Sequence, residues 1–367
     1  MLSEKIAREI GERGPMTVER FWEIALFDRK DGYYSTHEPF GRAGDFTTAP
    51  EISQMFGELI GAWCASVWAA LGRPSPFLLA EIGPGRGTLM ADILRTLRRT
   101  APDCLAASRI RLVETSERLA ALQASRLEGF DLPIKRVRRI EELESMPMIV
   151  VANELFDAIA IRQAVLDKGA WRERRIDLSA DGGFVFVLGD ALARLPVWLS
   201  AIDTSRLEEG AIAEYSPARE TLAAGLGQRL HTDGGAGLFI DYGHAISQVG
   251  DTFQALSEHR YVPVLDRPGE ADLTSHVDFE SLAHRFTEGG LMSSPIRTQG
   301  NFLLSMGLLE RAGRLGAPLD ETGRNQIRAD VQRLAGNGPK DMGDLFKVMG
   351  VSSAPIDLPP FSASGGD

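Results

Sequence analysis

The 367-residue chain carries 40 lysine and arginine residues against 51 aspartate and glutamate residues, so its formal net charge is −11. This excess of negative charge argues against a nucleic-acid partner, because phosphates would be repelled unless a local basic patch received them. The densest basic stretches, RTLRR and KRVRR, have acidic neighbours and are interpreted as solvated faces. The length predicts one large domain with additions, or two domains.

The cysteines and the N-terminal residues indicate the cellular compartment in which the protein is expected. Cys64 and Cys104 give neither a disulfide framework nor a metal-ligand spacing, and Cys64 falls in an apolar helix-like run where a buried thiol is expected. No apolar stretch reaches the roughly 18–20 residues of a membrane span. Glu4, Glu9 and Glu12 argue against an acid-poor transit peptide. We therefore expect a soluble, cytoplasmic protein.

The first 76 residues are predicted to hold helices and one long loop. Residues 1–28 have the pattern of two amphipathic helices separated at RGPMT, where Thr17 can cap the second. Residues 31–53 are rich in glycine and aromatic residues and follow neither a helical nor a strand period, so we expect a functional loop. Residues 53–71 are predicted to form a strongly apolar helix.

From residue 77 onward, short apolar runs alternate with amphipathic ones. Strands are predicted at FLLAEIG, IRLVETS, IKRVRR and the start of MIVVANELFDAI, with helices at TLMADILRTLRR and ERLAALQASRL. Ser116 can cap the second of these helices. The alternation predicts an α/β fold in which helices cover both faces of a parallel sheet.

The alternation stops after residue 161. Residues 162–189 are predicted to form antiparallel strands, and AIAEYSP and GLFIDYGH to return to the sheet on either side of a helix near 217–231. A helix and a strand are expected at 277–291, then helices to about residue 350. The expected division is N-terminal helices and loop 1–76, core 77–161 and 211–300, β insertion 162–210, helical accessory segment 301–355 and flexible tail 356–367.

The first predicted strand of the core ends in GPGRG, which places Gly83, Gly85 and Gly87 ahead of a helix. Such a turn lets a ligand approach bare backbone at the carboxyl edge of a sheet. The spacing departs from the dinucleotide fingerprint, because the third glycine comes one residue early. Glu81 would be unfavourable beside a pyrophosphate but favourable beside a cation, so S-adenosylmethionine fits better than NAD. A purely structural turn is the alternative.

The next predicted strand ends at Glu114. In nucleotide-binding α/β folds an acidic residue at this place accepts hydrogen bonds from ribose hydroxyl groups. The alternative is an acid that complements the dipole of the following helix. We favour the ribose role because Glu114 occurs together with Glu81 and the glycines, although Glu114 by itself would also suit NAD.

The strand in MIVVANELFDAI ends at Asn153 and Glu154, and Phe156 and Asp157 follow. An amide followed by an aromatic residue suits the positioning of a planar nitrogen nucleophile opposite a sulfonium methyl group, because direct displacement depends on alignment. A guanidinium acceptor would form bidentate pairs with carboxylates, which Glu154 and Asp157 can supply. Alternatively, Asn153 caps a following helix and Glu154 is solvated.

Another predicted strand ends in IDYGH, which places Asp241 and His244 at the same edge, and His276 follows in DLTSH. Asp241 can contact the acceptor or cap a turn, and either histidine can accept a proton near neutral pH. A lone histidine is more often structural and no pair has helical metal spacing, so we expect no metal site. The sequence also lacks G-x-S-x-G, P-loop and Cys/His patterns.

Together these segments resemble the MidA-type family of S-adenosylmethionine-dependent methyltransferases, whose mitochondrial members are complex I assembly factors. The resemblance rests on DGYYS, GRAGDFTTAPEISQMFGELIGAW, EIGPGRGTLMADILR, NELFDAI, IDYGH and DLTSHVDF, spread over residues 21–290. It implies a class I, Rossmann-like methyltransferase core with extra segments, and dimethylation of an arginine on a core complex I subunit. Ala160 stands where proline is expected, which affects only the turn after Asp157.

The resemblance also assigns residues to the cofactor. Those that would line it are Glu81, Gly83, Pro84, Gly85, Gly87, Glu114 and Asn153, and those that would close over it from the N-terminal loop are Asp45, Phe46 and Thr47. The residues expected to serve the methyl acceptor are Asn153, Glu154, Asp157 and Asp241.

We therefore predict an enzyme that moves a methyl group directly from S-adenosylmethionine to a protein nitrogen, an arginine in a basic segment that an acidic surface would suit. The partner would be a protein, and a respiratory complex I subunit is the partner that the resemblance implies. Two alternatives stay open. One is a small-molecule N- or O-methyltransferase, and the other is an assembly factor that binds the cofactor without turnover.

Overall fold

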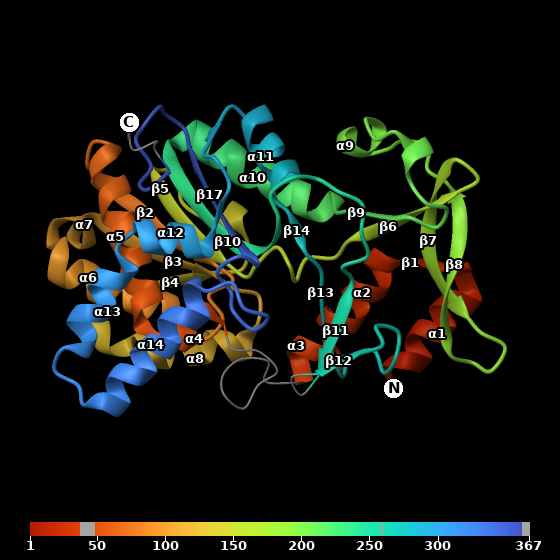
Figure 1. The fold of residues 1–367 in the computed structure, drawn as a ribbon, viewed down its shortest axis with the longest axis horizontal. Coiled ribbons are helices and arrows are strands. Elements are labelled where there is room, and N and C mark those ends of the chain that lie inside the picture. Colours follow the sequence, from red (N-terminus) through yellow and green to blue (C-terminus); the bar gives the residue numbers. More distant parts are fainter. Residues whose placement is uncertain (37–47, 258–259, 362–367) are drawn as a thin grey trace. The chain divides into compact units, whose positions relative to one another are not determined.

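The computed structural model describes residues 1–36, 48–257 and 260–361 (Figure 1). Contacts within the chain divide it into two compact units. The described residues of the first unit fall within 1–46, 156–222 and 246–281, and those of the second within 47–155, 223–245 and 282–367. We describe each unit by itself.

A mostly parallel sheet forms the centre of the second unit. Its parallel strands lie in the order β10 (Gly235–His244), β5 (Met148–Asn153), β2 (Phe77–Ile82), β3 (Ser108–Val113) and β4 (Lys135–Val137). β17 (Phe346–Ser352) pairs antiparallel with β10, and β15 (Met292–Ser293) and β16 (Arg297–Thr298) pair with β17. All side chains of β2 and β5 are buried, as expected for strands covered on both faces.

Helices cover both faces of this sheet (Figure 1). One face packs against α5 (Gln54–Ala70), α6 (Thr88–Thr100), α7 (Pro102–Ala107), α8 (Glu117–Leu127), α12 (Gln299–Ser305), α13 (Leu308–Gly316) and α14 (Glu321–Ala335). On the other face lie α10 (Pro217–Asp233) and α11 (Phe279–Glu288), where Phe286 stacks on Phe239 of β10 with the ring centroids 4.9 Å apart. Shorter elements are α4 (Ala49–Ile52), η1 (Glu128–Phe130) and η2 (Ile140–Glu142).

The first unit is built around antiparallel strands. The larger sheet has the order β1 (Met16–Thr17), β7 (Ala170–Leu178), β6 (Arg162–Asp167) and β9 (Ile212–Tyr215), and β8 (Phe184–Ala191) also pairs with β7. A smaller sheet has the order β12 (Arg260–Val262), β11 (Gln254–Ser257) and β13 (Asp272–Thr274). The remaining elements are α1 (Leu2–Arg13), α2 (Val18–Phe27), α3 (Tyr33–Thr36), α9 (Val197–Ser200), η3 (Thr204–Arg206) and β14 (Val277–Asp278).

The α/β fold and most of the predicted elements are confirmed. The strands and helices expected between residues 77 and 153 are all present, and α7 is an addition that the pattern did not indicate. Thr17 accepts the Arg20 N–H at 3.1 Å as the cap of α2, and Ser116 caps α8. Cys64 is fully buried, as expected. Within the described ranges, the helices all lack the length or the apolar composition that crossing a membrane requires.

Three predictions about elements are wrong. AIAEYSP does not return to the parallel sheet, because β9 pairs with β6 in the first unit. Helices do not continue to residue 350, because the apolar run Phe346–Ser352 forms β17 and is almost entirely buried. Residues 356–361 are not a loose tail, since Leu358 and Phe361 are buried and Phe361 lies 5.6 Å from Phe302, ring to ring. The burial of these two apolar side chains packs the proline-rich segment against the core.

Candidate functional site

The glycine turn lies at the carboxyl edge of the second unit's sheet, directly after β2. Gly83, Gly85 and Gly87 all have positive φ angles, of 67°, 51° and 78°, which glycine adopts without the steric cost that other residues meet. The Gly83 N–H donates to the carbonyl oxygen of Val113 at 3.1 Å, and the Gly87 N–H donates to that of Pro84 at 2.7 Å. The backbone conformation of the turn therefore accounts for the closely spaced glycines.

The glycine turn contacts the turn that follows β5. A Cβ atom on Gly83 would lie 3.1 Å from Leu155 Cδ1, so there is no room for a larger residue unless Leu155 moves. Leu155 is itself held by Asp241, whose Oδ2 accepts the Leu155 N–H at 3.1 Å and whose Oδ1 accepts the Tyr242 N–H at 2.9 Å. Asp241 is completely buried. This geometry favours the alternative left open by the sequence, in which Asp241 fixes a turn.

Glu81 is buried on β2, with 2% of its surface exposed. Burial raises the pKa of its carboxyl group to about 8, the nearby charge of Glu114 acts in the same direction, and a backbone hydrogen bond from Met90 opposes them. Its Oε2 has no hydrogen-bond partner among the described residues. Glu81 is thus mostly protonated near neutral pH, and a bound cation would favour its ionised form.

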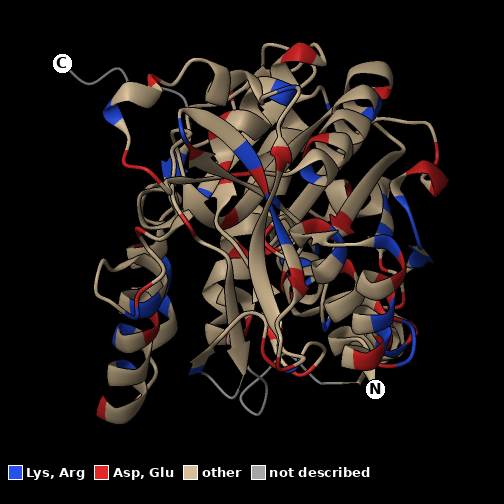
Figure 2. Ribbon diagram, turned by 90° about the vertical axis from the view of Figure 1, so that its right-hand side faces the viewer, with Lys and Arg blue, Asp and Glu red and all other residues tan. Residues whose placement is uncertain are grey.

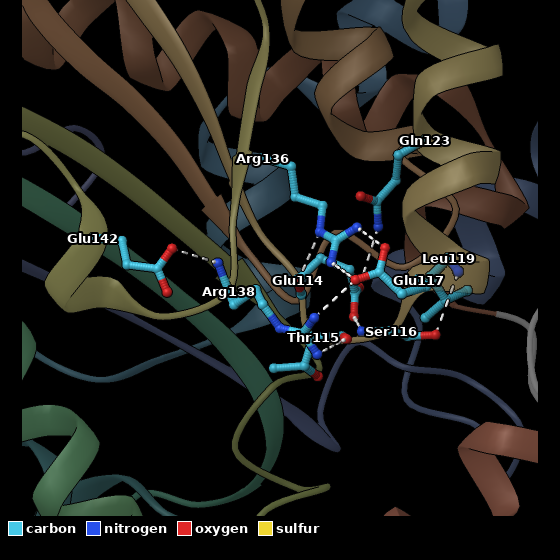
Figure 3. Close-up of polar contacts among 9 residues, drawn as sticks. All are labelled: Glu114, Thr115, Ser116, Glu117, Leu119, Gln123, Arg136, Arg138 and Glu142. Atoms are coloured by element: carbon cyan, nitrogen blue, oxygen red, sulfur yellow. Dashed lines mark hydrogen bonds and ion pairs between the residues drawn. The ribbon is translucent and has the colours of Figure 1, made fainter. Parts of the chain in front are cut away.

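Glu114 is held at the end of β3 by two hydrogen bonds (Figure 3). Its Oε1 accepts the Ser116 N–H at 2.7 Å, and its Oε2 accepts Gln123 Nε2 at 3.2 Å. The same Gln123 nitrogen donates to the carbonyl oxygen of Gly85 at 2.8 Å. Burial raises the pKa of Glu114, and the bonds from Ser116 and Gln123 work against that rise. One amide therefore joins the glycine turn to the predicted ribose acid.

Sequence reasoning missed Gln123. The available signal was its place on α8, where the buried positions Leu119, Gln123 and Leu127 are spaced four residues apart. A glutamine at the middle of an otherwise apolar helix stripe indicates a specific polar partner, because buried amides are normally hydrogen-bonded.

The basic stretch KRVRR is partly neutralised beside this cluster (Figure 3). Arg136 donates to the carbonyl oxygen of Glu114 at 3.0 Å and forms two hydrogen bonds of 2.7 Å with Glu117. Arg138 donates to the same Glu117 carboxylate at 2.9 Å. These contacts agree with the interpretation of this stretch as a face beside acidic neighbours.

A pocket of about 820 Å³ lies beside the Glu114 cluster, between α8, η1 and β4. Gln123 and Arg136 line it, together with apolar side chains such as Leu132 and Ile134. The glycines of the turn are not part of its wall, so we do not assign this pocket to a ligand of the turn.

Asn153 is the last residue of β5 and is 9% exposed. Its Nδ2 donates to Glu154 Oε1 at 2.9 Å, while its Oδ1 has no hydrogen-bond partner among the described residues. Residues 154–161, all of them described, contain no helix for Asn153 to cap, which contradicts the capping alternative.

Glu154 has a strained backbone. Its φ angle is +52°, which is uncommon for a residue other than glycine and costs on the order of 1 kcal/mol or more. The Glu154 N–H donates to the carbonyl oxygen of Ile240 at 2.9 Å, and Oε1 also accepts the Ala49 N–H at 3.4 Å. Strain of this kind is concentrated at functional sites, so it supports a functional role for this turn.

Three buried oxygen atoms around the turn share one property. Glu81 Oε2, Gln123 Oε1 and Asn153 Oδ1 have no hydrogen-bond partner among the described residues. Buried polar atoms are nearly always paired, so several unpaired acceptors near one edge indicate a ligand that brings hydrogen-bond donors. A cation with N–H and O–H groups fits this edge, because it would donate to these oxygens and favour the ionised form of Glu81.

The predicted acceptor residue Asp157 belongs to the first unit. It is 7% exposed, and its carbonyl oxygen accepts Arg219 Nη2 at 3.2 Å. Arg219 also donates to the carbonyl oxygens of Ile159 at 3.2 Å and His276 at 2.9 Å. In the same unit the Tyr34 hydroxyl group donates to Asp272 at 3.4 Å, and burial, Asp272 and Asp157 raise the pKa of Tyr34.

The remaining predicted residues are placed as follows. His244 ends β10 in the second unit, and His276 belongs to the first. Asp45, Phe46 and Thr47 lie outside the described residues. Within the described part of the chain, no cluster of three or more His, Cys, Asp or Glu side chains is arranged to hold a metal ion.

The model of a family of S-adenosyl-L-methionine-dependent methyltransferases matches residues 59–295. The chain is 34% identical to the mitochondrial protein arginine methyltransferase NDUFAF7 homolog of Drosophila melanogaster, over 98% of this chain and 87% of that protein. It is also 34% identical to mitochondrial NDUFAF7 of Danio rerio, over 94% of this chain and 85% of that protein.

A crystal structure from Burkholderia thailandensis, bound to S-adenosyl-homocysteine, has a TM-score of 0.81 and 26% sequence identity. The match covers 97% of this chain and 92% of that one. The names of the sequence relatives bear on location as well, since those from the fly, the zebrafish and human all carry the word mitochondrial. The prediction of a cytoplasmic location is therefore wrong.

Proposed function

Because the chain belongs to this family of S-adenosyl-L-methionine-dependent methyltransferases, we propose that it transfers the methyl group to an arginine side chain of a partner protein. The enzyme uses S-adenosyl-L-methionine as its methyl donor. The proposal of arginine is carried by one observation: relatives that align with more than nine-tenths of the chain are named protein arginine methyltransferases.

The donor suits the edge of the sheet around the glycine turn. When bound, it supplies an electrophilic methyl group on a sulfonium centre. The residues that we propose to hold it are Gly83, Pro84, Gly85 and Gly87 through their backbone, Glu114 through the ribose hydroxyl groups, and Glu81 and Asn153 through their buried oxygens. Its ammonium and hydroxyl groups are the donors that the unpaired oxygens lack, and it brings no phosphate to meet Glu81.

We propose that the turn after β5 receives the methyl acceptor. The Glu154 carboxylate can accept a guanidinium N–H and balance its positive charge, and Asn153, whose amide donates to Glu154, holds that carboxylate in place. Asp241 acts indirectly, by fixing the Leu155 amide. Asp157, which the sequence also suggested for the acceptor, lies in the first unit, so we assign it no contact in this site. In direct displacement the nitrogen would bond to the methyl carbon as the carbon–sulfur bond of the donor breaks, and S-adenosylhomocysteine would leave. The Glu154 carboxylate or water would take up the proton that the nitrogen loses. These groups align the substrate, and no covalent enzyme intermediate is needed.

The charge of the chain suits a basic partner segment. Figure 2 shows acidic residues spread among basic ones over the helices and strands, and the sum is a net charge of −11. A negative protein attracts a positively charged peptide over distances of about a Debye length. In keeping with the family resemblance, a subunit of respiratory complex I is the partner that we propose to test first.

Quantitative mass spectrometry of methylarginine tests the proposal. Proteins from cells lacking the gene would be compared with those from cells that carry the wild-type gene, Glu154→Gln, or the control Glu321→Gln, which changes an exposed side chain of α14. We expect one or a few methylarginine sites to disappear without the gene, to return with the wild type and the control, and to stay absent with Glu154→Gln.

The outcomes separate the alternatives. An unchanged set of methylarginine sites in the absence of the gene contradicts protein arginine methylation. If the sites return with Glu154→Gln as fully as with wild type, then Glu154 has no part in the transfer. The purified Glu154→Gln protein should still bind S-adenosylhomocysteine within about threefold of wild type, which shows that its donor site is intact.

A further inference from the structure

Gln123 lies on the buried face of α8 and is 1% exposed. Its side-chain nitrogen donates two hydrogen bonds, one to the Gly85 carbonyl oxygen at 2.8 Å and one to Glu114 Oε2 at 3.2 Å. The aliphatic part of the same side chain packs on the turn, because a Cβ atom on Gly87 would lie 3.5 Å from Gln123 Cγ. One side chain therefore contacts both parts of the proposed donor site.

Burial alone does not explain a glutamine at this position. Leu119 and Leu127 flank it on the same helix face, and a leucine would fill the space without leaving Oε1 buried and unpaired. An unpaired buried acceptor costs free energy, which the structure accepts here. The two bonds made by Nε2 are the compensating feature, and both end at the proposed donor site.

We propose that Gln123 is a positioning residue of the methyl-donor site: it holds the Glu114 carboxylate at a fixed place relative to the glycine turn, so that the carboxylate can receive the ribose. The inference rests on the placement of the donor proposed above. Ser116 and Gln123 bond to different Glu114 oxygens, and the Thr115 amide also interacts with the carboxylate. A carboxylate has about four acceptor sites, so these contacts leave room for a ribose hydroxyl group.

Calorimetric titration of the purified full-length protein with S-adenosylhomocysteine tests this inference and needs no knowledge of the methyl acceptor. We expect Gln123→Leu to weaken binding at least tenfold, because Glu114 loses its orientation and the Gly85 carbonyl loses its donor. The matched control is Gln299→Leu. Gln299 is also fully buried, also donates to a backbone carbonyl oxygen, that of Leu334 at 2.9 Å, and also has an unpaired Oε1. The Gln299→Leu variant should have a lower melting temperature, but its affinity for S-adenosylhomocysteine should stay within twofold of wild type.

A double-mutant cycle with Glu114→Gln separates positioning from a general loss of structure. If Gln123 acts through Glu114, the double variant should bind no more than about twofold more weakly than Glu114→Gln alone. The inference would be overturned if the losses of affinity of the two single variants multiply in the double variant. It would also be overturned if Gln123→Leu binds S-adenosylhomocysteine within threefold of wild type. A wild-type protein that does not bind S-adenosylhomocysteine would instead overturn the placement of the donor.

Gln123→Glu provides a second variant of the same shape in case Gln123→Leu does not fold. The new carboxyl group can donate to Glu114 only when it is protonated. At high pH both carboxylates are ionised and repel each other, whereas at low pH one proton is shared between them. We expect its affinity relative to wild type to be at least tenfold lower at about pH 8 and to recover at about pH 5.5. A ratio that does not change with pH contradicts a role through Glu114.

Discussion

Two buried carboxyl groups, Glu81 and Glu114, stand at the ends of adjacent strands next to the glycine turn. Burial raises the pKa of both, and Glu81 reaches about 8. In the absence of a ligand the region is therefore less negative than its sequence suggests. A bound cation would reverse this by favouring the ionised forms, so donor binding and the loss of protons should be coupled.

The pH dependence of stability tests the state of Glu81. Its pKa is above the ordinary value of 4.5 when folded, so its contribution to stability is fully present below about pH 4.5 and is lost as the pH rises through about 8. Glu81→Gln removes this dependence. Between about pH 5.5 and pH 9 without ligand, the variant should gain on the order of 3 kcal/mol relative to wild type in denaturant unfolding. A difference that stays constant over this range would contradict the raised pKa.

At the residue scale, the sequence was informative where a strand end carries an unusual side chain. Glu81, Glu114 and Asn153 were all predicted in this way, and all three are buried at or next to the ends of neighbouring parallel strands; their contact with the donor stays a prediction. Gln123 was not found, because its partners come from other segments of the chain. Whether Asp241 contacts the acceptor or fixes a turn was also open in the sequence, and only the hydrogen bond to the Leu155 amide shows what its carboxylate does.

The strand–turn–helix of β2, the glycine turn and α6 is the element on which the proposed donor site is built. Glycine is required here for two reasons. Each of the three glycines has a positive φ angle, and Gly83 also lies against Leu155, where a side chain would not fit. The positive φ angles and the hydrogen bonds within the turn account for its backbone conformation, which is also one that lets a ligand approach the main chain. The structural and functional explanations of the turn are therefore compatible.

A comparison of Gly83→Ala with Gly72→Ala separates the effect of backbone strain from an effect on donor binding. Both glycines have positive φ angles, 67° and 83°, but a Cβ on Gly72 would meet nothing within 4 Å, whereas one on Gly83 would meet Leu155 at 3.1 Å. Each variant should lose about 1–2 kcal/mol of stability through backbone strain. Only Gly83→Ala should weaken S-adenosylhomocysteine binding, by at least tenfold in calorimetry. Equal affinities would show that the turn does not contact the donor.

At the element scale, local pattern was sufficient wherever an element is specified by its own period. It predicted β2, β3 and β5 because parallel strands buried on both faces have continuous apolar runs. It predicted α6 and α8 because amphipathic runs alternate with those strands. It predicted the strand β9 but assigned it to the wrong sheet, and it missed β17; the partners of both strands are distant in sequence. An apolar run such as Phe346–Ser352 is compatible with a buried helix or a buried strand, and its pairing with β10 decides between them.

At the scale of the whole molecule, the chain combines the mostly parallel sheet of the second unit with the antiparallel strands of the first unit. The residues that we propose to hold the donor all belong to the unit with the parallel sheet, while Asp157 belongs to the other. The sequence predicted an antiparallel segment after residue 161, but it did not indicate that the N-terminal helices share a hydrophobic core with it. That core joins Trp22 to Phe253, whose rings stack at 5.1 Å.

A crystal structure of the full-length protein with S-adenosylhomocysteine tests the central claim most directly. We predict that the ribose hydroxyl groups will lie within hydrogen-bond distance of Glu114, and that the amino-acid part of the ligand will rest on the backbone of residues 83–87. Electron density for the ligand at any other place, such as the pocket beside α8 and β4, would contradict the account.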